Sequence, residues 1–558
     1  MMRKKIQIII KKEGKDIIYY TERGTTLTQI IEKFKIAGKK NIIAAIVNNY
    51  LVDLSEQVNN NSEIEFVSVV TDKGLSIYRD TATHILAYAV KKIFGKDILN
   101  IGPSIRYNYY FDLESNIKID KKLLKKIEKE MLNIIRKDIS IKKEVIPAEE
   151  GIKFYEEKKE YDKANLIRTS GLEFVRFYFI ENFGELCNGP LAPSTGFITK
   201  FKLVPYPPGF LLMFPKIYDG KLLIKYEKTP KKLSKVFLET RDWYKEQGVS
   251  NVAHLNQIIL DNKLSELITI SEALHEKRIS QIADIITRKK SEIKIILIAG
   301  PSASGKTTFS KRLGIHLRVN GIKPVSISLD NYFVDRDKTP RDENGNYDFE
   351  CLEALDINLL NRHLIDLLDG KTIMVPQFDF HKGRRKKEKV PLKLEKDQIV
   401  IIEGIHGLNE KLTSKIPKRN KFKIYVSALT QLRLSDYHRI TTTDTRLLRR
   451  IVRDFLFREH TALDTLKMWP SVHRGEEKYI FLFQEDADVM FNSALIYETA
   501  VLKPFVYKYL LSVSHKYPEY VESKRLLEIL DFFVDAPARD VPKTSILREF
   551  IGGSSFKY

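Results

Sequence analysis

The residues with the clearest chemical signature lie in the run GPSASGKTT, from Gly300 to Thr308. Gly300, Gly305, Lys306 and Thr307 complete the pattern G-x-x-x-x-G-K-[ST]. Glycines let the backbone turn tightly around a phosphate, and the N-terminus of a following helix adds partial positive charge. We therefore predict that a nucleoside triphosphate is bound by Gly300, Ser302, Ala303, Ser304, Gly305, Lys306, Thr307 and Thr308.

Two side chains of this loop have separate predicted roles. Lys306 would reach the β- and γ-phosphates, and the Thr307 hydroxyl would be a ligand of Mg²⁺. A single pattern match can arise by chance, so its surroundings matter. Here the apolar run IKIILIA precedes the loop and the helical stretch TFSKRLGIHLRVNG follows it. The sequence thus supplies the strand, loop and helix that the pattern requires.

Two carboxylates end predicted strands in the same half of the chain. Asp330 ends PVSISLD, and Glu403 ends QIVIIE. Strands and helices alternate from residue 292 onward, which predicts an α/β fold with a parallel sheet, helices on both faces and ligands at the strands' carboxyl ends. Asp330 is placed to be a general base and Glu403 to hold Mg²⁺. A turn aspartate and a helix-capping acid are the alternatives.

Together these segments resemble the uridine/cytidine kinases of the phosphoribulokinase/uridine kinase group, over roughly residues 290–500. The matching stretches are GPSASGKT, LDNYF, YDF, PQFDFHKGRR, IIEGIHGL and RRIVRDFLFRE. The resemblance implies ATP and Mg²⁺ as cofactors and a nucleoside as the substrate. It also implies a set of catalytic residues, namely Asp330, Lys306, Arg450, Arg453 and Arg458.

The same resemblance implies a set of substrate-binding residues. They are Tyr332, Tyr347, Asp348, Phe378, His381 and Arg450, with Asp348 on the ribose hydroxyls and the aromatic side chains on the base. For any single aromatic residue, ordinary core packing is the alternative. Phe349 replaces a histidine of the family pattern, and His460 replaces the last lid arginine. The phosphoryl-transfer groups are therefore kept while the base pocket differs.

The first 240 residues have a different organisation. A strand pair, a helix and further strands over 1–70 give a β-grasp-like order. The stretches IVNNYLVDL, RDTATHILAYAV, IGPSIRYNYYFDLE and ELCNGPLAP resemble the TGS and editing domains of threonyl-tRNA synthetase. The expected domains are a β-grasp domain at 1–70, an editing-like α+β domain at 71–240, a helical linker at 241–290 and a P-loop kinase domain at 291–558.

The editing-like domain lacks half of its expected metal ligands. The family pattern has H-x-x-x-H on a helix that we expect to begin at Asp80 or Thr81, and C-x-x-x-H in a later loop. Here the first pair is His84 and Tyr88, and the second is Cys187 and Leu191. A zinc site needs about three protein ligands. We therefore predict neither a metal nor editing activity. His84 and Cys187 are then either a buried polar pair left from the family's site or ordinary core residues.

Composition limits the class of protein. The 558 residues are 43% hydrophobic and 30% charged, which is typical of folded domains, and the net charge of +21 favours phosphate-bearing partners. The most basic run, KGRRKKEKV at 382–390, is more typical of a solvated hairpin tip than of an RNA contact. Two distant cysteines and no apolar run near ~18 residues predict a cytoplasmic protein without disulfides or a membrane span.

These residues bear on three possible functions, namely a GTPase, a tRNA-editing hydrolase and a nucleoside kinase. A translational-type GTPase needs N-K-x-D after the phosphate loop, but Asn420-Lys421 continues with Phe422-Lys423. The incomplete ligand set argues against a tRNA-editing hydrolase. We therefore predict ATP-dependent phosphorylation of a nucleoside, uridine or cytidine first, to its 5′-monophosphate. The N-terminal half would bind RNA or a nucleotide effector, or regulate the kinase half, and the sequence leaves a homo-oligomer open.

Overall fold

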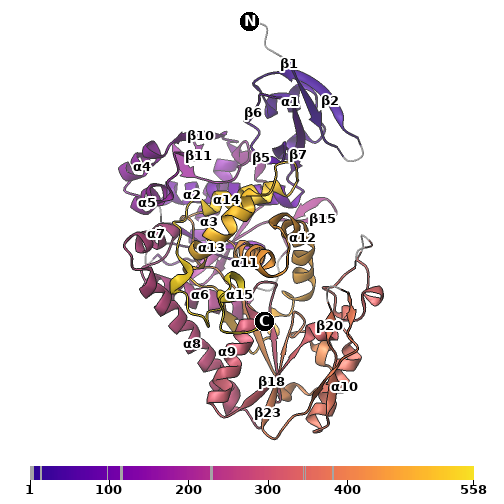
Figure 1. Cartoon of the computed structure of the whole chain (residues 1–558). Coiled ribbons are helices and arrows are strands. Elements are labelled where there is room, and N and C mark those ends of the chain that lie inside the picture. Colours follow the sequence, from indigo (N-terminus) through magenta and orange to yellow (C-terminus); the bar gives the residue numbers. More distant parts are fainter. Residues whose placement is uncertain are drawn as a thin grey trace.

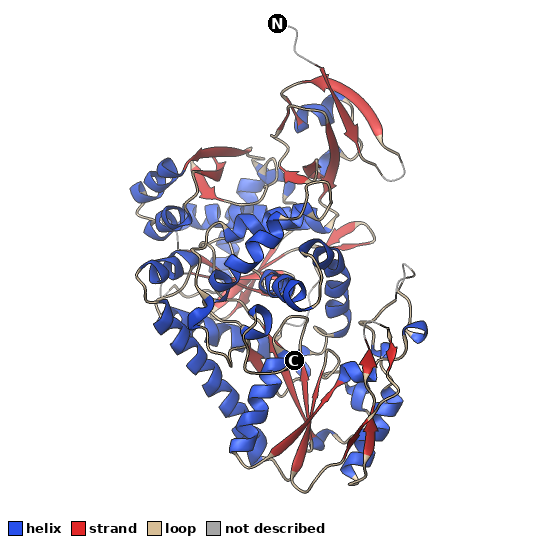
Figure 2. Ribbon diagram, in the orientation of Figure 1, coloured by secondary structure: helices blue, strands red, loops and turns tan. Residues whose placement is uncertain are grey.

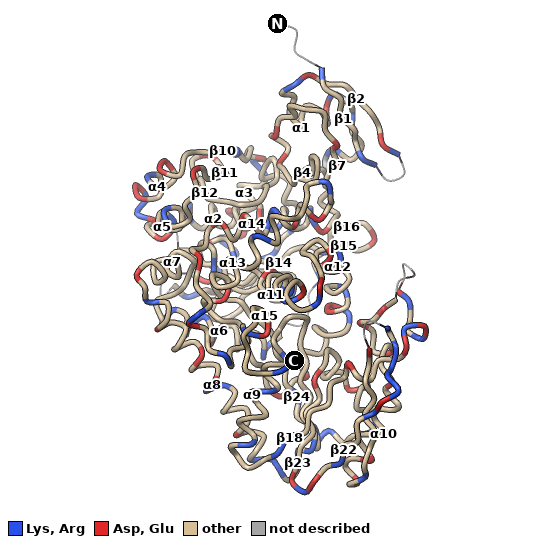
Figure 3. Tube along the Cα trace, in the orientation of Figure 1, with Lys and Arg blue, Asp and Glu red and all other residues tan. Residues whose placement is uncertain are grey.

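The computed structural model describes residues 5–12, 15–96, 98–113, 117–225, 230–342, 345, 347–379 and 382–558. A small N-terminal module lies at one end of the molecule and a parallel sheet at the other (Figures 1 and 2). Across the described ranges, no helix is both long and apolar enough to cross a membrane. Lys and Arg positions and Asp and Glu positions are spread over all parts of the fold, with other residues between them (Figure 3).

The N-terminal module confirms the predicted β-grasp arrangement. Its mixed sheet has the strand order β2-β1-β7-β4-β5, with β1 and β7 parallel. The elements are β1 (Lys5–Ile10), β2 (Ile17–Glu22), α1 (Leu27–Lys33), β4 (Ile42–Val47), β5 (Tyr50–Val52) and β7 (Ser62–Ser68). Ile8, Ile30 and Ile64 are fully buried between the helix and the sheet, so the alternating apolar residues of the strands form the core of this module.

The second part is an α+β domain with two antiparallel sheets, ordered β10-β11-β12 and β13-β14-β9-β8. Its helices are α2 (Asp72–Phe94), α3 (Lys121–Arg136), α4 (Ala148–Glu157) and α5 (Tyr161–Ser170). Its strands are β8 (Leu99–Ile105), β9 (Asn108–Leu113), β10 (Ile141–Pro147), β11 (Phe174–Ile180), β12 (Phe183–Leu186), β13 (Lys202–Tyr206) and β14 (Gly209–Met213). This confirms the fold class expected for this region.

The predicted start of α2 was wrong. The helix begins two turns before Asp80 and Thr81, because Thr71 caps it by accepting a hydrogen bond from the Gly74 amide. Gly74 is tolerated inside the helix because it lies against the preceding strand. A Cβ there would stand 1.9 Å from the Ser68 carbonyl oxygen. Gly74 therefore has a packing role.

Three helices join the halves, namely α6 (Lys231–Glu246), α7 (Val252–Leu260) and α8 (Leu264–Arg288). They are more than a connector. Ile268 and Ile282 of α8 belong to the largest buried core, which also contains Phe177 of the N-terminal half and Phe309 of the kinase-like half. Helix α6 runs across residue 240, where we predicted a domain boundary. That boundary stays a prediction.

The C-terminal half contains five parallel strands in the order β18-β23-β17-β24-β25. They are β17 (Ile295–Ala299), β18 (Lys323–Ser328), β23 (Gln398–Glu403), β24 (Lys421–Ser427) and β25 (Val489–Asn492). Ile296 and Ile298 face one core, with α8 and α9 (Lys306–Val319), whereas Ile295 and Leu297 face another with α10 (Ile357–Leu368). Burial of both faces explains the continuous apolar run before the phosphate loop and confirms the predicted α/β class.

The remaining helices are α11 (Thr442–Phe457), α12 (Ala462–Tyr479), α13 (Glu498–Leu511), α14 (Tyr520–Leu530) and α15 (Arg548–Ile551). Helix α14 lies against the N-terminal half (Figure 1). The Asn188 side-chain amide donates to the Glu528 carbonyl oxygen at 3.2 Å, and the Tyr520 hydroxyl donates to that of Tyr50 at 3.3 Å. The loop that carries Cys187 is therefore covered by a helix of the other half.

A buried ion pair supports the same junction. The Lys163 ammonium nitrogen lies 2.8 and 3.0 Å from the two carboxylate oxygens of Glu185, and both side chains are almost completely buried. The ammonium also stands 4.6 Å from the ring centre of Tyr437, in the C-terminal half. Lys163 and Glu185 both belong to the N-terminal half, and Lys163 reaches the C-terminal half through this ring contact.

We predict that Glu185→Ala lowers the free energy of unfolding by about 3 kcal/mol, because it leaves a buried ammonium incompletely compensated. Differential scanning calorimetry measures this as a lower Tm. Lys153→Ala, on an exposed face of α4, is the control and should leave Tm unchanged. Equal Tm values for the two variants would show that the pair does not stabilise the junction.

Candidate active site

The predicted phosphate loop connects β17 to α9, as the sequence indicated. Ala303 and Gly305 have positive φ values of 56° and 81°, which turn the backbone sharply before the helix begins at Lys306. A Cβ on Gly300 would stand 1.9 Å from the Val426 carbonyl oxygen, so only glycine fits there. The Lys306 ammonium donates to the Pro301 carbonyl oxygen at 3.1 Å and therefore folds over the loop.

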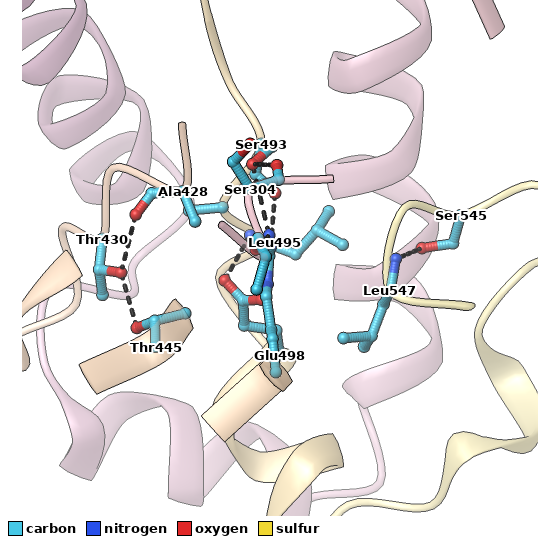
Figure 4. Close-up of polar contacts among 12 residues, drawn as sticks. Ser304, Ala428, Thr430, Thr445, Ser493, Leu495, Glu498, Ser545 and Leu547 are labelled. Atoms are coloured by element: carbon cyan, nitrogen blue, oxygen red, sulfur yellow. Dashed lines mark hydrogen bonds and ion pairs between the residues drawn. The ribbon is translucent and has the colours of Figure 1, made fainter. Parts of the chain in front are cut away.

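A set of buried polar groups supports this loop from below (Figure 4). The Ser493 hydroxyl donates to the Ser304 carbonyl oxygen, and Glu498 accepts from the Leu495 amide. Arg449 donates to the Ala303 carbonyl oxygen at 3.4 Å and pairs with Glu498 at 2.6 Å. Because Arg449 is completely buried, it holds the loop in shape and does not face a substrate.

Glu476 of α12 is a second support that the sequence did not specify. Its carboxylate accepts from the Ser302 amide at 2.8 Å and pairs with Arg446, and both side chains are buried. Glu476 belongs to the stretch HRGEEK, residues 473–478. From the sequence this stretch could be a charged turn or a segment that contacts the nucleotide. The structure places it within a helix, with Gly475 so close to Glu350 that a Cβ would stand 2.6 Å from that side chain.

The predicted metal ligands lie together. The Thr307 hydroxyl donates to a carboxylate oxygen of Glu403 at 3.1 Å. Burial raises the pKa of Glu403 to about 7, and the negative charges of Glu549 and Asp330 add to this while Lys306 opposes it. A hydroxyl and a carboxylate at the edge of a phosphate loop fit Mg²⁺, which prefers oxygen ligands and keeps several waters. A cation there would offset the excess of negative charge.

Asp330 follows β18, in a short 3-10 helix at Leu329–Tyr332. The Asp330 side chain is exposed to solvent on one side. Burial by the surrounding protein raises the pKa of its carboxyl group, and the positive charges of Lys306, Arg458 and Arg453 oppose that shift. Burial lowers the pKa of Lys306, while Glu403, Glu549 and Asp330 oppose that shift. Asp330, Lys306 and Glu403 thus lie close enough for the charge of Lys306 to shift the pKa of both carboxyl groups, and their roles stay predictions.

Three predicted lid arginines converge on one carboxylate. Arg450, Arg453 and Arg458 contact Asp454 at 3.0, 3.4 and 3.3 Å. Asp454 is buried in α11, and the sequence gave no reason to select it. Arg450 also donates to the Ser302 hydroxyl at 2.8 Å, which connects the lid helix to the phosphate loop.

A cavity of about 450 Å³ opens beside this site and is large enough for a small organic molecule. Asp348 lines it, and its carboxylate accepts from the Tyr479 hydroxyl at 3.0 Å. Gly475 and Tyr479 of α12 form part of the wall. Since the neighbouring Glu476 holds the Ser302 amide, the cavity lies next to the phosphate loop. Asp348 thus lines a cavity, and its contact with a substrate stays a prediction.

The predicted aromatic residues do not line the cavity as a group. Tyr332 is completely buried, and its hydroxyl bonds His363 at 3.0 Å, so it packs in the core and not against a substrate. Tyr347 lies under the Arg341 guanidinium at 4.4 Å, and Phe378 packs against Phe333 at 5.7 Å. His381 lies outside the described residues.

His84 and Cys187 of the editing-like domain are both buried. Burial lowers the pKa of His84 to about 3 and raises that of Cys187 to about 12, so both groups are neutral near pH 7. His84 packs 5.2 Å from the ring of Phe183, and the Tyr88 hydroxyl donates to Glu181. Over the part of the chain that the structure describes, no three His, Cys, Asp or Glu side chains gather in a way that could hold a metal.

Comparison with known proteins gives two separate resemblances along the chain. Residues 295–500 match the model of the "Phosphoribulokinase / Uridine kinase family". The N-terminal half is similar to threonine–tRNA ligases. The ligase of Clostridium kluyveri is 36% identical over 194 residues, which cover 35% of this chain and 30% of the ligase. That of Carboxydothermus hydrogenoformans is 36% identical over 199 residues, or 35% and 31% of the two chains. The chain thus spans about a third of the length of these relatives.

Two solved structures align with the chain more weakly. A possible uridine kinase from Bacillus stearothermophilus is 18% identical, with a TM-score of 0.25 over 38% of this chain and 96% of its own. A putative fructose transport system kinase from Silicibacter sp. TM1040 is 14% identical, with a TM-score of 0.26 over 38% and 98%. The two predicted resemblances, to the kinase family and to threonyl-tRNA synthetase, are confirmed by the family model and the ligases.

We predict that neither cysteine reacts readily with a thiol reagent in the folded protein. Cys187 and Cys351 are both buried, and burial raises the pKa of each, so the reactive thiolate is scarce at pH 8. Absorbance with DTNB should show labelling slower by at least about 100-fold than in guanidinium. Rapid labelling of Cys187 at pH 8 in the native protein would show that the site is open.

Proposed function

Because residues 295–500 carry a domain of the phosphoribulokinase/uridine kinase family, we propose that this protein transfers the γ-phosphoryl group of ATP to the 5′-hydroxyl of a nucleoside. Uridine or cytidine is the first candidate acceptor. The single observation that carries the proposal is the placement of Asp330 and Asp348. The first lies within electrostatic range of Lys306, and the second lines the adjoining cavity.

The side chains divide the reaction between them. Asp330 takes the proton of the 5′-hydroxyl as that oxygen bonds to the γ-phosphorus, and the bond to the β–γ bridging oxygen breaks to release ADP. Lys306, Arg450 and Arg453 offset the negative charge on the transferred group. Thr307 and Glu403 would hold Mg²⁺, which supplies further neutralisation of the phosphate oxygens when bound.

The cavity favours an acceptor without a phosphate group. Its lining combines three cationic side chains with three anionic ones, namely Arg341, Arg474 and Lys478 with Asp342, Asp348 and Glu353. Among its described lining residues the positive and negative charges are equal in number, which gives no preference for a sugar phosphate. A carboxylate such as Asp348 suits the hydroxyl groups of a ribose, since hydroxyl donors bond strongly to charged acceptors. A neutral nucleoside therefore fits better than a phosphorylated sugar.

The N-terminal half has a binding or regulatory role in this proposal. Its similarity to threonine–tRNA ligases favours RNA, and a nucleotide effector is the alternative. Editing chemistry is disfavoured because α14 covers the loop of Cys187 and because His84 and Cys187 are both neutral.

We predict that Asp330→Asn lowers kcat/KM by about 10²- to 10⁴-fold, because an amide does not accept the proton. The wild-type rate should rise with pH as Asp330 ionises, with a midpoint above the ordinary value of 3.8. In Asp330→Asn this rise should disappear. Asp337→Asn, at an exposed position nearby, is the control and should keep full activity. Full activity of Asp330→Asn would contradict its role as the base.

Lys306→Ala tests the donor side separately. It should lower kcat by at least about 10²-fold because a charge that stabilises the transition state is lost. The coupled assay for ADP release measures it, and circular dichroism confirms the fold. Retention of wild-type kcat would show that the loop does not bind the transferred phosphate.

A further inference from the structure

The last residues of the chain return to the phosphate loop. We name Ser545–Tyr558 the C-terminal segment; it includes α15 and ends beside α9 (Figure 1). A carboxylate oxygen of Glu549 accepts two hydrogen bonds from Thr308, from the amide at 3.1 Å and from the hydroxyl at 2.7 Å. Glu549 is 9% exposed and Thr308 is fully buried, so water does not compete for these bonds.

The position of this carboxylate is chemically informative. Thr308 is the third residue of α9, and the N–H groups of a first helical turn have no partner within the helix. In a glycine-rich loop followed by a helix, these donors bind the phosphates of the nucleotide. Glu549 therefore places an anionic oxygen on donors that the nucleotide would use. The Thr308 amide and hydroxyl cannot donate to the Glu549 carboxylate and to a phosphate at the same time.

The rest of the C-terminal segment fills the adjoining space. A Cβ on Gly305 would stand 2.4 Å from the nearest methyl carbon of Ile546, so this side chain lies directly over the loop. The Tyr558 hydroxyl lies 2.8 Å from that of Thr308 and 3.0 Å from that of Ser554. Three residues of the segment thus cover the loop where it enters α9.

The C-terminal segment has a buried, fixed part and a more exposed part that can move. Ile546, Leu547 and Phe550 are completely buried, and the Phe550 ring stands 5.1 Å from the guanidinium carbon of Arg449. Residues 552–558 are more exposed, and Gly552 and Gly553 have positive φ values of 85° and 72°. The Glu549 side chain and residues 552–558 can therefore move while the apolar anchors stay packed.

We propose that the C-terminal segment is an intramolecular competitor of the donor nucleotide, with Glu549 on the phosphate-binding donors until ATP displaces it. This inference rests on the proposed use of ATP. The apparent affinity for ATP is then the intrinsic affinity multiplied by the fraction of molecules in which Glu549 has left Thr308. A change that weakens the Glu549 contact therefore strengthens nucleotide binding.

Isothermal titration calorimetry of the full chain with MgATP gives the first test. Glu549→Gln keeps the shape of the side chain but removes its charge, and hydrogen bonds to charged groups are the stronger ones. We expect the Kd for ATP to fall by roughly five- to tenfold. Asp540→Asn removes one charge from the preceding turn without contact to the loop and should leave Kd unchanged. Tyr558→Phe should lower Kd by a smaller factor.

Hydrogen exchange of the wild-type chain, read by mass spectrometry, gives a second test that needs no variant. Saturating MgATP should make residues 552–558 exchange faster while the loop at 300–308 exchanges more slowly. If Glu549→Gln does not fold, this measurement decides alone.

The outcomes separate this inference from the proposed function. Equal Kd values for Glu549→Gln and wild type, or residues 552–558 that become more protected with ATP, would overturn the competitor while leaving an ATP-binding kinase. ATP binding by none of the proteins would overturn the use of ATP and the competitor together. A lower Kd in Glu549→Gln alone, with faster exchange at 552–558, would establish it.

Discussion

Backbone amides at the start of α9 need anionic partners, and much of the C-terminal half is arranged around that need. The loop is held in a conformation that only glycine allows at Gly300, where a side chain would meet the carbonyl of Val426. Its donors point toward Glu476 and Glu549, which accept from the Ser302 and Thr308 amides. The sheet and helices below fix the loop, so that a phosphate has to exchange with, or fit beside, carboxylates that the protein itself supplies.

The parts of the site that follow from local sequence were predictable. A buried strand, a glycine-rich turn and a helix form a contiguous pattern. Glu403 ends β23 and Asp330 follows β18 by two residues, so these neighbouring parallel strands bring both carboxylates to one edge of the sheet. Glu549 lies 241 residues from Thr308, and no local pattern relates them. Asp454 was missed because a carboxylate among arginines on a helix is usually a surface ion pair, whereas this one is buried.

Aromatic residues were predicted less well, for a physical reason. A tyrosine after a strand suits both a stacking surface and a buried core with its hydroxyl bonded, and the sequence does not separate the two. Tyr332 packs in the buried core because His363 of α10 provides a hydrogen-bond partner for its hydroxyl there. In the N-terminal half the strand and helix types were predictable, but the cover of α14 over the Cys187 loop was not. That contact joins residues 188 and 528 and depends on the complete fold.

We expect a neutral nucleoside to accept the phosphoryl group at the cavity that Asp348 lines. The most direct measurement incubates the purified protein with Mg²⁺ and γ-labelled ATP against separate acceptors, namely the common nucleosides, phosphorylated pentoses and no acceptor. Chromatography and mass spectrometry then identify the labelled product. We expect a labelled nucleoside 5′-monophosphate, with uridine or cytidine as the best acceptor, and little label in the phosphorylated pentoses. Release of labelled phosphate at the same rate with and without acceptors, or labelling of a sugar phosphate alone, would contradict it.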